Sequence, residues 1–142
     1  MKRKLFVVLL LVVTTITTFA QKIDYTTYDV VAQKGNVSVV VKDNDWKMII
    51  GSLKKPKQVF LLGYSKEQAT SKIDRIIEIG SNENCIKKDR NVSFCGIPLQ
   101  LTITGSGDNE KYLFVSDNKH KFSLTKKDCL DIKQSIKKYT SN

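Results

Sequence analysis

Catalysis by a serine or cysteine nucleophile needs a nearby base, and the sequence contains one histidine, His120. His120 follows the turn-like stretch 117–119 and has lysines close on either side, so we expect a solvated side chain there. Ser116 or Ser123 could form a triad with Asp117 and His120, but the spacing gives that arrangement no support. The sequence therefore does not indicate nucleophilic hydrolysis.

Metal and cofactor sites also lack a recognisable pattern. The three cysteines, Cys85, Cys95 and Cys129, are separated by ten and then 34 positions, which matches no zinc-binding spacing. The acidic stretches 43–45 and 105–110 contain oxygen ligands, but not in the order of a calcium-binding loop. Turn formation explains both stretches, and we expect neither a metal nor a cofactor.

Lysines are the remaining candidates for a binding function. Lys54, Lys55 and Lys57 precede the first helical segment closely, and Lys119 and Lys121 occupy the matching place before the second. If the two halves of the chain are related, these groups approach similar ends of a sheet and form one basic surface for a polyanion or a partner protein. The alternative is a solvated rim without a ligand.

The cysteines suggest one disulfide and one spare thiol. A hairpin turning at residues 89–91 would place Cys85 opposite Cys95, at a separation that a disulfide can span. Closing such a short loop stabilises a fold by roughly 2–3 kcal/mol in the chain-entropy treatment. Cys129 is expected to be a small core residue, because the sequence near it offers no base to activate a thiol.

Residues 1–20 resemble a cleaved export signal. A basic start, Lys2 to Lys4, precedes the apolar run 5–13, and Thr18-Phe19-Ala20 is close to a signal-peptidase site. The alternative is a retained membrane anchor. Cleavage predicts a periplasmic or secreted protein, with no transmembrane segment afterwards, and the style of the signal favours a bacterial source.

Composition then limits the mature chain. Removing 20 of 142 residues leaves 122 residues (21–142), a length that suits one domain. Three of the 24 basic residues leave with the signal, so 21 basic and 14 acidic residues remain and the mature net charge is +7. Such a charge favours anionic partners, although it also fits a basic protein with no such partner.

Two strand-to-helix segments, 58–80 and 120–139, determine the predicted fold. In the first, Ser65 and Gln68 form an S-x-x-Q capping sequence, and in the second Thr125 and Asp128 hold the same positions. Apolar residues follow each cap at helical spacing: Ala69, Ile73, Ile76 and Ile77 in the first helix, and Cys129, Ile132, Ile136 and Tyr139 in the second.

Strand signals fill the rest of the chain. We expect strands at 25–32, 37–42, 46–50 and 57–63, then a hairpin over 84–94 and strands at 99–104, 111–116 and 120–124. The sequence thus predicts an α+β fold with antiparallel sheet(s) and two helices packed on the sheet. The pattern suggests a duplicated ββββα unit, with halves at about 24–80 and 83–139.

These observations favour an exported, non-catalytic binding protein whose ligand is a protein or an anionic envelope component. Nucleic acid is a less suitable partner, because no aromatic residues lie among the lysines to stack on bases. Two alternatives remain open: a small envelope hydrolase, and an inhibitor or immunity-like protein.

Overall fold

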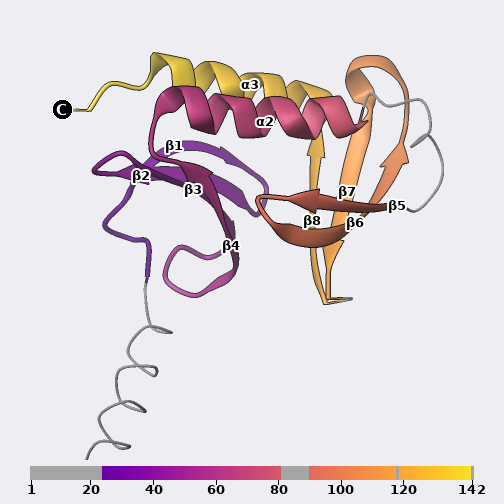
Figure 1. Ribbon diagram of the computed structural model, residues 1–142, viewed down its shortest axis with the longest axis horizontal. Coiled ribbons are helices and arrows are strands. Elements are labelled where there is room, and N and C mark those ends of the chain that lie inside the picture. Colours follow the sequence, from indigo (N-terminus) through magenta and orange to yellow (C-terminus); the bar gives the residue numbers. More distant parts are fainter. Residues whose placement is uncertain (1–23, 81–89, 118, 142) are drawn as a thin grey trace, which may run out of the picture.

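Two successive ββββα units make up residues 24–80, 90–117 and 119–141, which are the residues that the computed structural model describes (Figure 1). The first unit comprises β1 (Asp29–Lys34), β2 (Val37–Lys42), β3 (Asp45–Gly51), β4 (Pro56–Gly63) and α2 (Lys66–Gly80). The second comprises β5 (Arg90–Phe94), β6 (Ile97–Thr104), the 3₁₀ turn η2 (Gly107–Asn109), β7 (Lys111–Ser116), β8 (His120–Thr125) and α3 (Lys126–Lys138).

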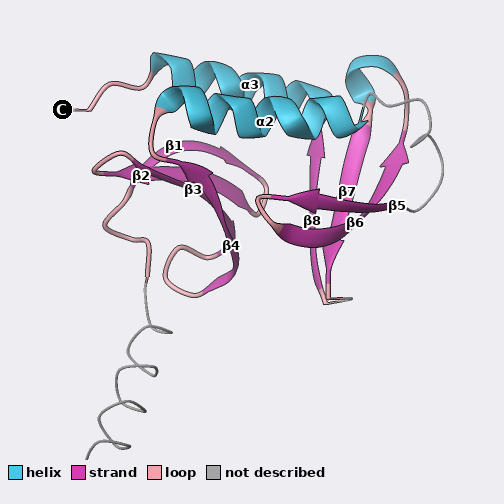
Figure 2. Cartoon of the chain, viewed as in Figure 1, coloured by secondary structure: helices cyan, strands magenta, loops and turns pink. Residues whose placement is uncertain are grey.

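Each unit forms its own antiparallel sheet. The strands follow chain order in both sheets, β1-β2-β3-β4 and β5-β6-β7-β8. The two helices lie side by side along the top of the view in Figure 2, and their buried residues join the same core as the sheets. The predicted α+β class, with two helices packed on antiparallel sheets, is therefore confirmed.

Tight turns connect the strands where residues accept a positive φ. Asp43 and Asn44 join β2 to β3 with φ of 50° and 64°, as expected for a two-residue type I′ turn. Cys95 and Gly96 join β5 to β6 in the same way, with φ of 52° and 79°. The predicted hairpin turn at 89–91 is wrong for Asn91, which pairs with Gln100 inside the β5–β6 ladder.

The helix caps follow the predicted capping sequences, with one difference. At α3, Thr125 Oγ1 accepts from the Asp128 N–H and Asp128 Oδ2 accepts from the Thr125 N–H, both at 3.0 Å. At α2, Ser65 Oγ accepts from the Gln68 N–H at 3.1 Å, but Gln68 Oε1 accepts from the N–H of Tyr64 at 2.7 Å. Both helices thus begin where the sequence predicts.

One hydrophobic core connects the two units. Ile73 and Ile76 of α2 and Ile132 and Ile136 of α3 are all buried, as predicted. They belong to a single cluster of buried side chains that includes residues from both sheets. Neither unit buries these helix faces alone, because the two helices also pack against each other.

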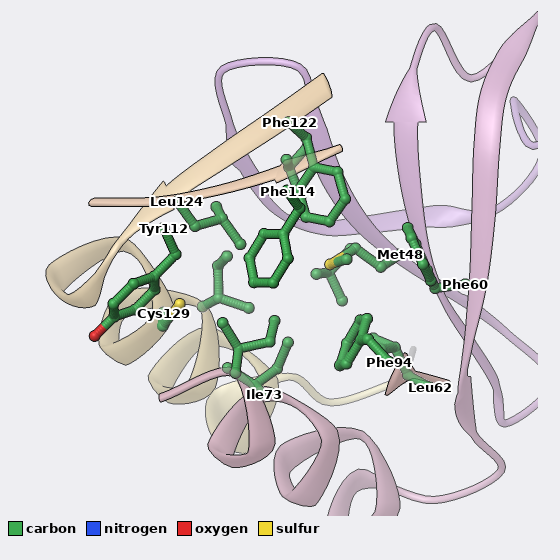
Figure 3. Close-up of a cluster of buried hydrophobic side chains, with 14 of the residues drawn as sticks. Met48, Phe60, Leu62, Ile73, Phe94, Tyr112, Phe114, Phe122, Leu124 and Cys129 are labelled. Carbon is green, nitrogen blue, oxygen red and sulfur yellow. The ribbon is translucent and has the colours of Figure 1, made fainter. Parts of the chain in front are cut away.

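Aromatic rings bridge the two sheets at the centre of this core (Figure 3). The ring of Phe60, from β4, lies 5.3 Å from that of Phe94 and 5.6 Å from that of Phe122, measured between centroids. Phe122 in turn stacks on Phe114 at 4.8 Å. Phe60 of the first unit therefore packs into an aromatic cluster whose other rings, Phe94, Phe114 and Phe122, come from the second unit.

A second, smaller cluster covers the outer face of the first sheet. Val40 and Ile49 point away from the helices, yet both are buried, together with Tyr25. The Tyr25 N–H donates to the Leu53 carbonyl at 2.8 Å, which holds the segment before β1 against this face. The strand predicted over 25–32 therefore begins only at Asp29, because the preceding residues cover the sheet instead of extending it.

Candidate functional site

The first group of predicted site lysines lies at the start of β4. Lys54 and Lys55 belong to the β3–β4 loop and Lys57 to β4 itself, and all three side chains are exposed. Ser52 organises the loop, because its Oγ accepts from the backbone N–H groups of Lys54 and Lys55 at 3.2 and 3.4 Å. The loop lies on the side of the molecule away from the helices (Figure 1).

The second group lies at the β7–β8 turn. Lys119 and Lys121 are exposed, and the turn is closed by the Lys119 N–H, which donates to the Ser116 carbonyl at 3.0 Å. This turn also projects away from α2 and α3 in Figure 1. Both predicted groups thus lie on the side of the fold opposite the helices.

The β1–β2 turn links the two groups. Asn36 Nδ2 donates to the Lys121 carbonyl at 3.3 Å, and the Asn36 carbonyl accepts from the Gly51 N–H at 2.8 Å. Gly51 lies against Lys57: a Cβ atom at Gly51 would be 3.2 Å from Lys57 Cγ. Gly51 also pairs with Pro56, the residue before Lys57, so the backbone at Lys121 and the start of β4 both contact the Asn36 turn or its partner Gly51, although they come from different halves.

The charges of these lysines are largely unbalanced. Within the described part of the chain, Lys54, Lys55, Lys57, Lys119 and Lys121 form no ion pair. Four other cationic side chains do pair with acids, in Lys34–Asp131, Lys47–Asp45, Arg75–Glu78 and Lys133–Asp74. The predicted site lysines are thus available to an external anion.

Lys54 has one acidic neighbour at longer range. The pKa of Asp24 is lowered, first by hydrogen bonds from Thr26 and, to a smaller extent, by the positive charge of Lys54. This weak interaction leaves the ammonium group of Lys54 exposed, so it does not remove the lysine from the basic surface.

Cys95 lines a groove that the sequence did not reveal. The groove has a volume of about 670 Å³ and lies between the end of β4, the first turns of α2 and the β5–β6 turn. The residues that line it are Leu61, Leu62, Gly63, Tyr64, Glu67, Gln68, Ser71, Lys72 and Cys95. Leu61 and Tyr64 are 40% and 64% exposed. The run Leu61-Leu62 was the available signal, because alternation in a strand forces one of the two leucines outward.

The two described thiols are not activated. Burial raises the pKa of Cys95 to about 11, although the charge of Lys72 acts in the opposite direction. Burial, followed by the negative charge of Asp128, raises the pKa of Cys129 to about 12. Cys129 is fully buried in the core, where the sequence analysis expected it.

The predicted Cys85–Cys95 disulfide stays a prediction. Cys95 carries a free thiol among the described residues, but Cys85 lies outside them. The hairpin geometry that motivated the pairing is not observed, because Cys95 itself occupies the β5–β6 turn. The pairing therefore needs a direct chemical test.

Of the two serines considered for a hydrolytic triad, Ser116 is buried and Ser123 is half-buried on β8, where it pairs with Leu113. His120 is the first residue of β8, is partly buried, and pairs across the turn with Ser116 of β7. Ser116 is 1% exposed, so a substrate cannot reach its hydroxyl group. The described residues also contain no group of three or more His, Cys, Asp or Glu side chains that is placed to hold a metal ion.

A second hollow, of about 680 Å³, lies at the C-terminal end of α3. Trp46 and Tyr139 lie on it with their rings edge to face, 5.5 Å between centroids, and the Tyr139 hydroxyl donates to Asp29 Oδ2 at 2.7 Å. Lys42 and Lys66 line it together with acidic residues, so its charges do not select one class of ligand.

Comparisons with protein-family models, with curated proteins and with solved structures found no match for this chain. Among the described helices, none has the length and apolar character needed to cross a membrane. The candidate site therefore rests on residues of this chain alone: five exposed lysines in two groups, one from each half, and an apolar groove at β4.

Proposed function

We propose that this chain is an exported, non-catalytic binding protein that engages an anionic envelope component through Lys54, Lys55, Lys57, Lys119 and Lys121. The observation that carries the proposal is the contact of the Asn36 turn with the backbone of Lys121 and of Gly51, beside Lys57. It brings the backbone of Lys121 to the turn that also contacts the end of β3, which supports a single basic surface from both halves that a polyanion contacts at several points.

Electrostatics favour this partner over a neutral one. Residues 51–57 and 117–121 contain five lysines and a single acid, Asp117. A charged surface of this kind attracts anions at long range, and the attraction weakens as salt is added, since the Debye length is about 8 Å at physiological ionic strength. The burial of Ser116 supports the non-catalytic interpretation, because a nucleophile there would not meet a substrate.

The test uses the mature chain, residues 21–142, on heparin-agarose as an acidic-glycan probe and on vesicles containing phosphatidylglycerol as a lipid probe. The double variant Lys57→Gln, Lys121→Gln should elute from heparin at clearly lower salt or lose vesicle binding. Lys137→Gln, Lys138→Gln is the matched control, because it removes the same charge from exposed positions at the end of α3.

The results distinguish the candidate functions. Equal losses in the two double variants would show that net charge alone governs binding, and salt-insensitive binding would rule out a polyanion. A stoichiometric complex with one exported protein, unaffected by Lys57→Gln and Lys121→Gln, would instead favour the inhibitor or immunity-like alternative.

A further inference from the structure

The outer faces of the two sheets differ in what covers them. On the first sheet, Val40 and Ile49 are buried on this face because they cluster with Tyr25 from the segment before β1. On the second sheet, Gln100 lies between two buried leucines of β6, and its own side chain is exposed. Strand residues alternate between the faces of a sheet, so Gln100 belongs to an outer face that is in contact with water.

One row of side chains crosses this accessible face from edge to edge. Asn91 of β5 pairs with Gln100 of β6, and Gln100 pairs in turn with Val115 of β7. Val115 pairs with Lys121 of β8, which completes the row. Residues directly opposite in neighbouring strands share a face, with Cβ atoms about 5 Å apart. Because strands lie about 4.8 Å apart, the row spans roughly 14 Å, with two amides at one end and an ammonium group at the other.

A hollow of about 360 Å³ lies along this row. Both amides of the row are exposed, and no hydrogen bond occupies either of them in the described part of the chain. Each amide offers N–H donors and a carbonyl acceptor. Apolar atoms of Pro98 and Val115 lie between the polar groups, and a few polar groups on an apolar lining are typical of a small-molecule site. The residues that line the hollow are Asn91, Pro98, Leu99, Gln100, Val115 and Asp117.

We propose that the outer face of the second sheet binds an acidic oligosaccharide. Sugar hydroxyl groups bind to the amides of Asn91 and Gln100, and a carboxylate or sulfate group of the sugar pairs with Lys121. This inference rests on the proposed polyanion function, which already assigns Lys121 to the binding surface, and it names the chemical class of the anion.

Asp117 favours a sugar over a bare anion. Its exposed carboxylate lines the hollow, where it repels a phosphate or sulfate group but accepts a hydrogen bond from a hydroxyl group. The exposed Lys119 and Lys121 follow it in the chain, at the β7–β8 turn and on β8. Amides, a carboxylate and ammonium groups together match a ligand that carries both hydroxyl groups and negative charge. An acidic sugar is such a ligand.

The test titrates the mature chain with two acidic sugars, a heparin-derived hexasaccharide and an oligogalacturonate. Maltohexaose is the neutral sugar, and inorganic polyphosphate is the anion without hydroxyl groups. Asn91→Ala with Gln100→Ala should weaken binding of an acidic sugar at least about tenfold, because hydrogen bonds from two amides are lost, and should change polyphosphate binding less than about twofold. Lys121→Gln should weaken binding of both anionic classes, and maltohexaose should bind at least about tenfold more weakly than the acidic sugar.

Gln33→Ala with Gln134→Ala is the matched control. It removes two exposed amides from β1 and α3, outside the second sheet, and should change no affinity by more than about twofold. Nuclear magnetic resonance gives a local readout: the side-chain NH₂ signals of Asn91 and Gln100 should shift as the acidic sugar is added, and those of Gln33 and Gln134 should stay in place.

The outcomes separate this inference from the polyanion proposal. Failure of both acidic sugars to bind, equal losses in the two amide variants, or unmoved Asn91 and Gln100 signals would overturn the sugar assignment. The polyanion proposal survives that result if Lys57→Gln with Lys121→Gln still weakens binding to polyphosphate or to anionic vesicles. Maltohexaose binding as tight as that of the acidic sugars would overturn the charge requirement of both. Vesicle binding that only the Asn91 and Gln100 variant loses, without sugar binding, would assign the face to a lipid headgroup instead.

Discussion

Replacing Phe122 with alanine should lower the unfolding midpoint of both halves of the molecule together. Phe122 is buried in the second unit, stacked on Phe114 and edge-on to Phe60 of the first unit. Truncating a buried phenylalanine costs about 3–5 kcal/mol, through lost apolar contact and a residual cavity. With a urea dependence of about 2 kcal/mol per molar, the midpoint should fall by roughly 1.5–2.5 M.

The single tryptophan makes this prediction sharp. Trp46 is buried on β3 in the first unit, with its ring against Tyr139 at the end of α3, so its fluorescence reports on the first unit and on that one contact with the second, whereas far-UV circular dichroism reports on both units. If the shared core couples the units, the urea midpoints of both signals should fall by the same amount in Phe122→Ala. The control Leu130→Ala, at an exposed position, should shift neither midpoint by more than a few tenths of a molar. A Trp46 transition that stays at the wild-type midpoint while circular dichroism shows an earlier step would refute a single cooperative core. It would also contradict the prediction that residues 21–142 form one domain.

Two further predictions concern the cap of α3 and the thiols. Thr125→Ala should lower the free energy of unfolding by about 1 kcal/mol, because it removes the acceptor for the Asp128 N–H. Chemical denaturation measures this change, and Ser123→Ala is the neighbouring control. In reduced protein, Cys95 should alkylate at pH 8 roughly tenfold more slowly than a thiol with the ordinary pKa of 9.0, because its thiolate is about a hundredfold rarer but about tenfold more nucleophilic. The rate should rise about tenfold per pH unit up to about pH 11. A fast reaction at pH 8 would contradict the partial burial of the Cys95 thiol. Without reduction, alkylation at Cys95 would contradict the predicted disulfide with Cys85, and Cys129 should remain unmodified until the protein unfolds.

The order of elements was predictable because its signals are local. Thr125 with Asp128 and Ser65 with Gln68 begin the two helices within a few residues of sequence, and the isoleucines after them repeat at helical spacing. The polar and apolar alternation at 99–104 likewise predicts a strand with one wet face, and β6 has it. Such signals do not depend on how distant segments meet.

Other features of the fold depend on contacts between distant segments and were missed for that reason. Alternation in β2 and β3 gives no indication that Tyr25 would cover Val40 and Ile49 on the outer face. The turn at Cys95–Gly96 was also missed, because the polar stretch before β5 looked a better turn than a cysteine followed by glycine. In both cases tertiary packing decided between locally acceptable alternatives.

The candidate site was predictable in its residues and not in its geometry. The two lysine clusters were visible as charge at matching places before each helix, and all five lysines are exposed. Their connection through Asn36 depends on a hydrogen bond between residues 85 positions apart. The groove depends on Leu61 and Cys95 meeting across the junction of the units. Sequence patterns identify such residues, but only the fold brings them together.

One position of the repeated strand-to-helix arrangement carries different chemistry in the two halves. Leu61 and Lys121 occupy corresponding positions on the strands that precede the helices. In the second half the strand edge is met by Asn36 and the outward side chain is a lysine, so that edge contributes charge. In the first half the outward residue is Leu61, which is 40% exposed and lines the groove beside α2, so it contributes an apolar surface. The two halves therefore share the order of their elements without sharing a surface, because one position of the repeated arrangement is a lysine in one half and a leucine in the other.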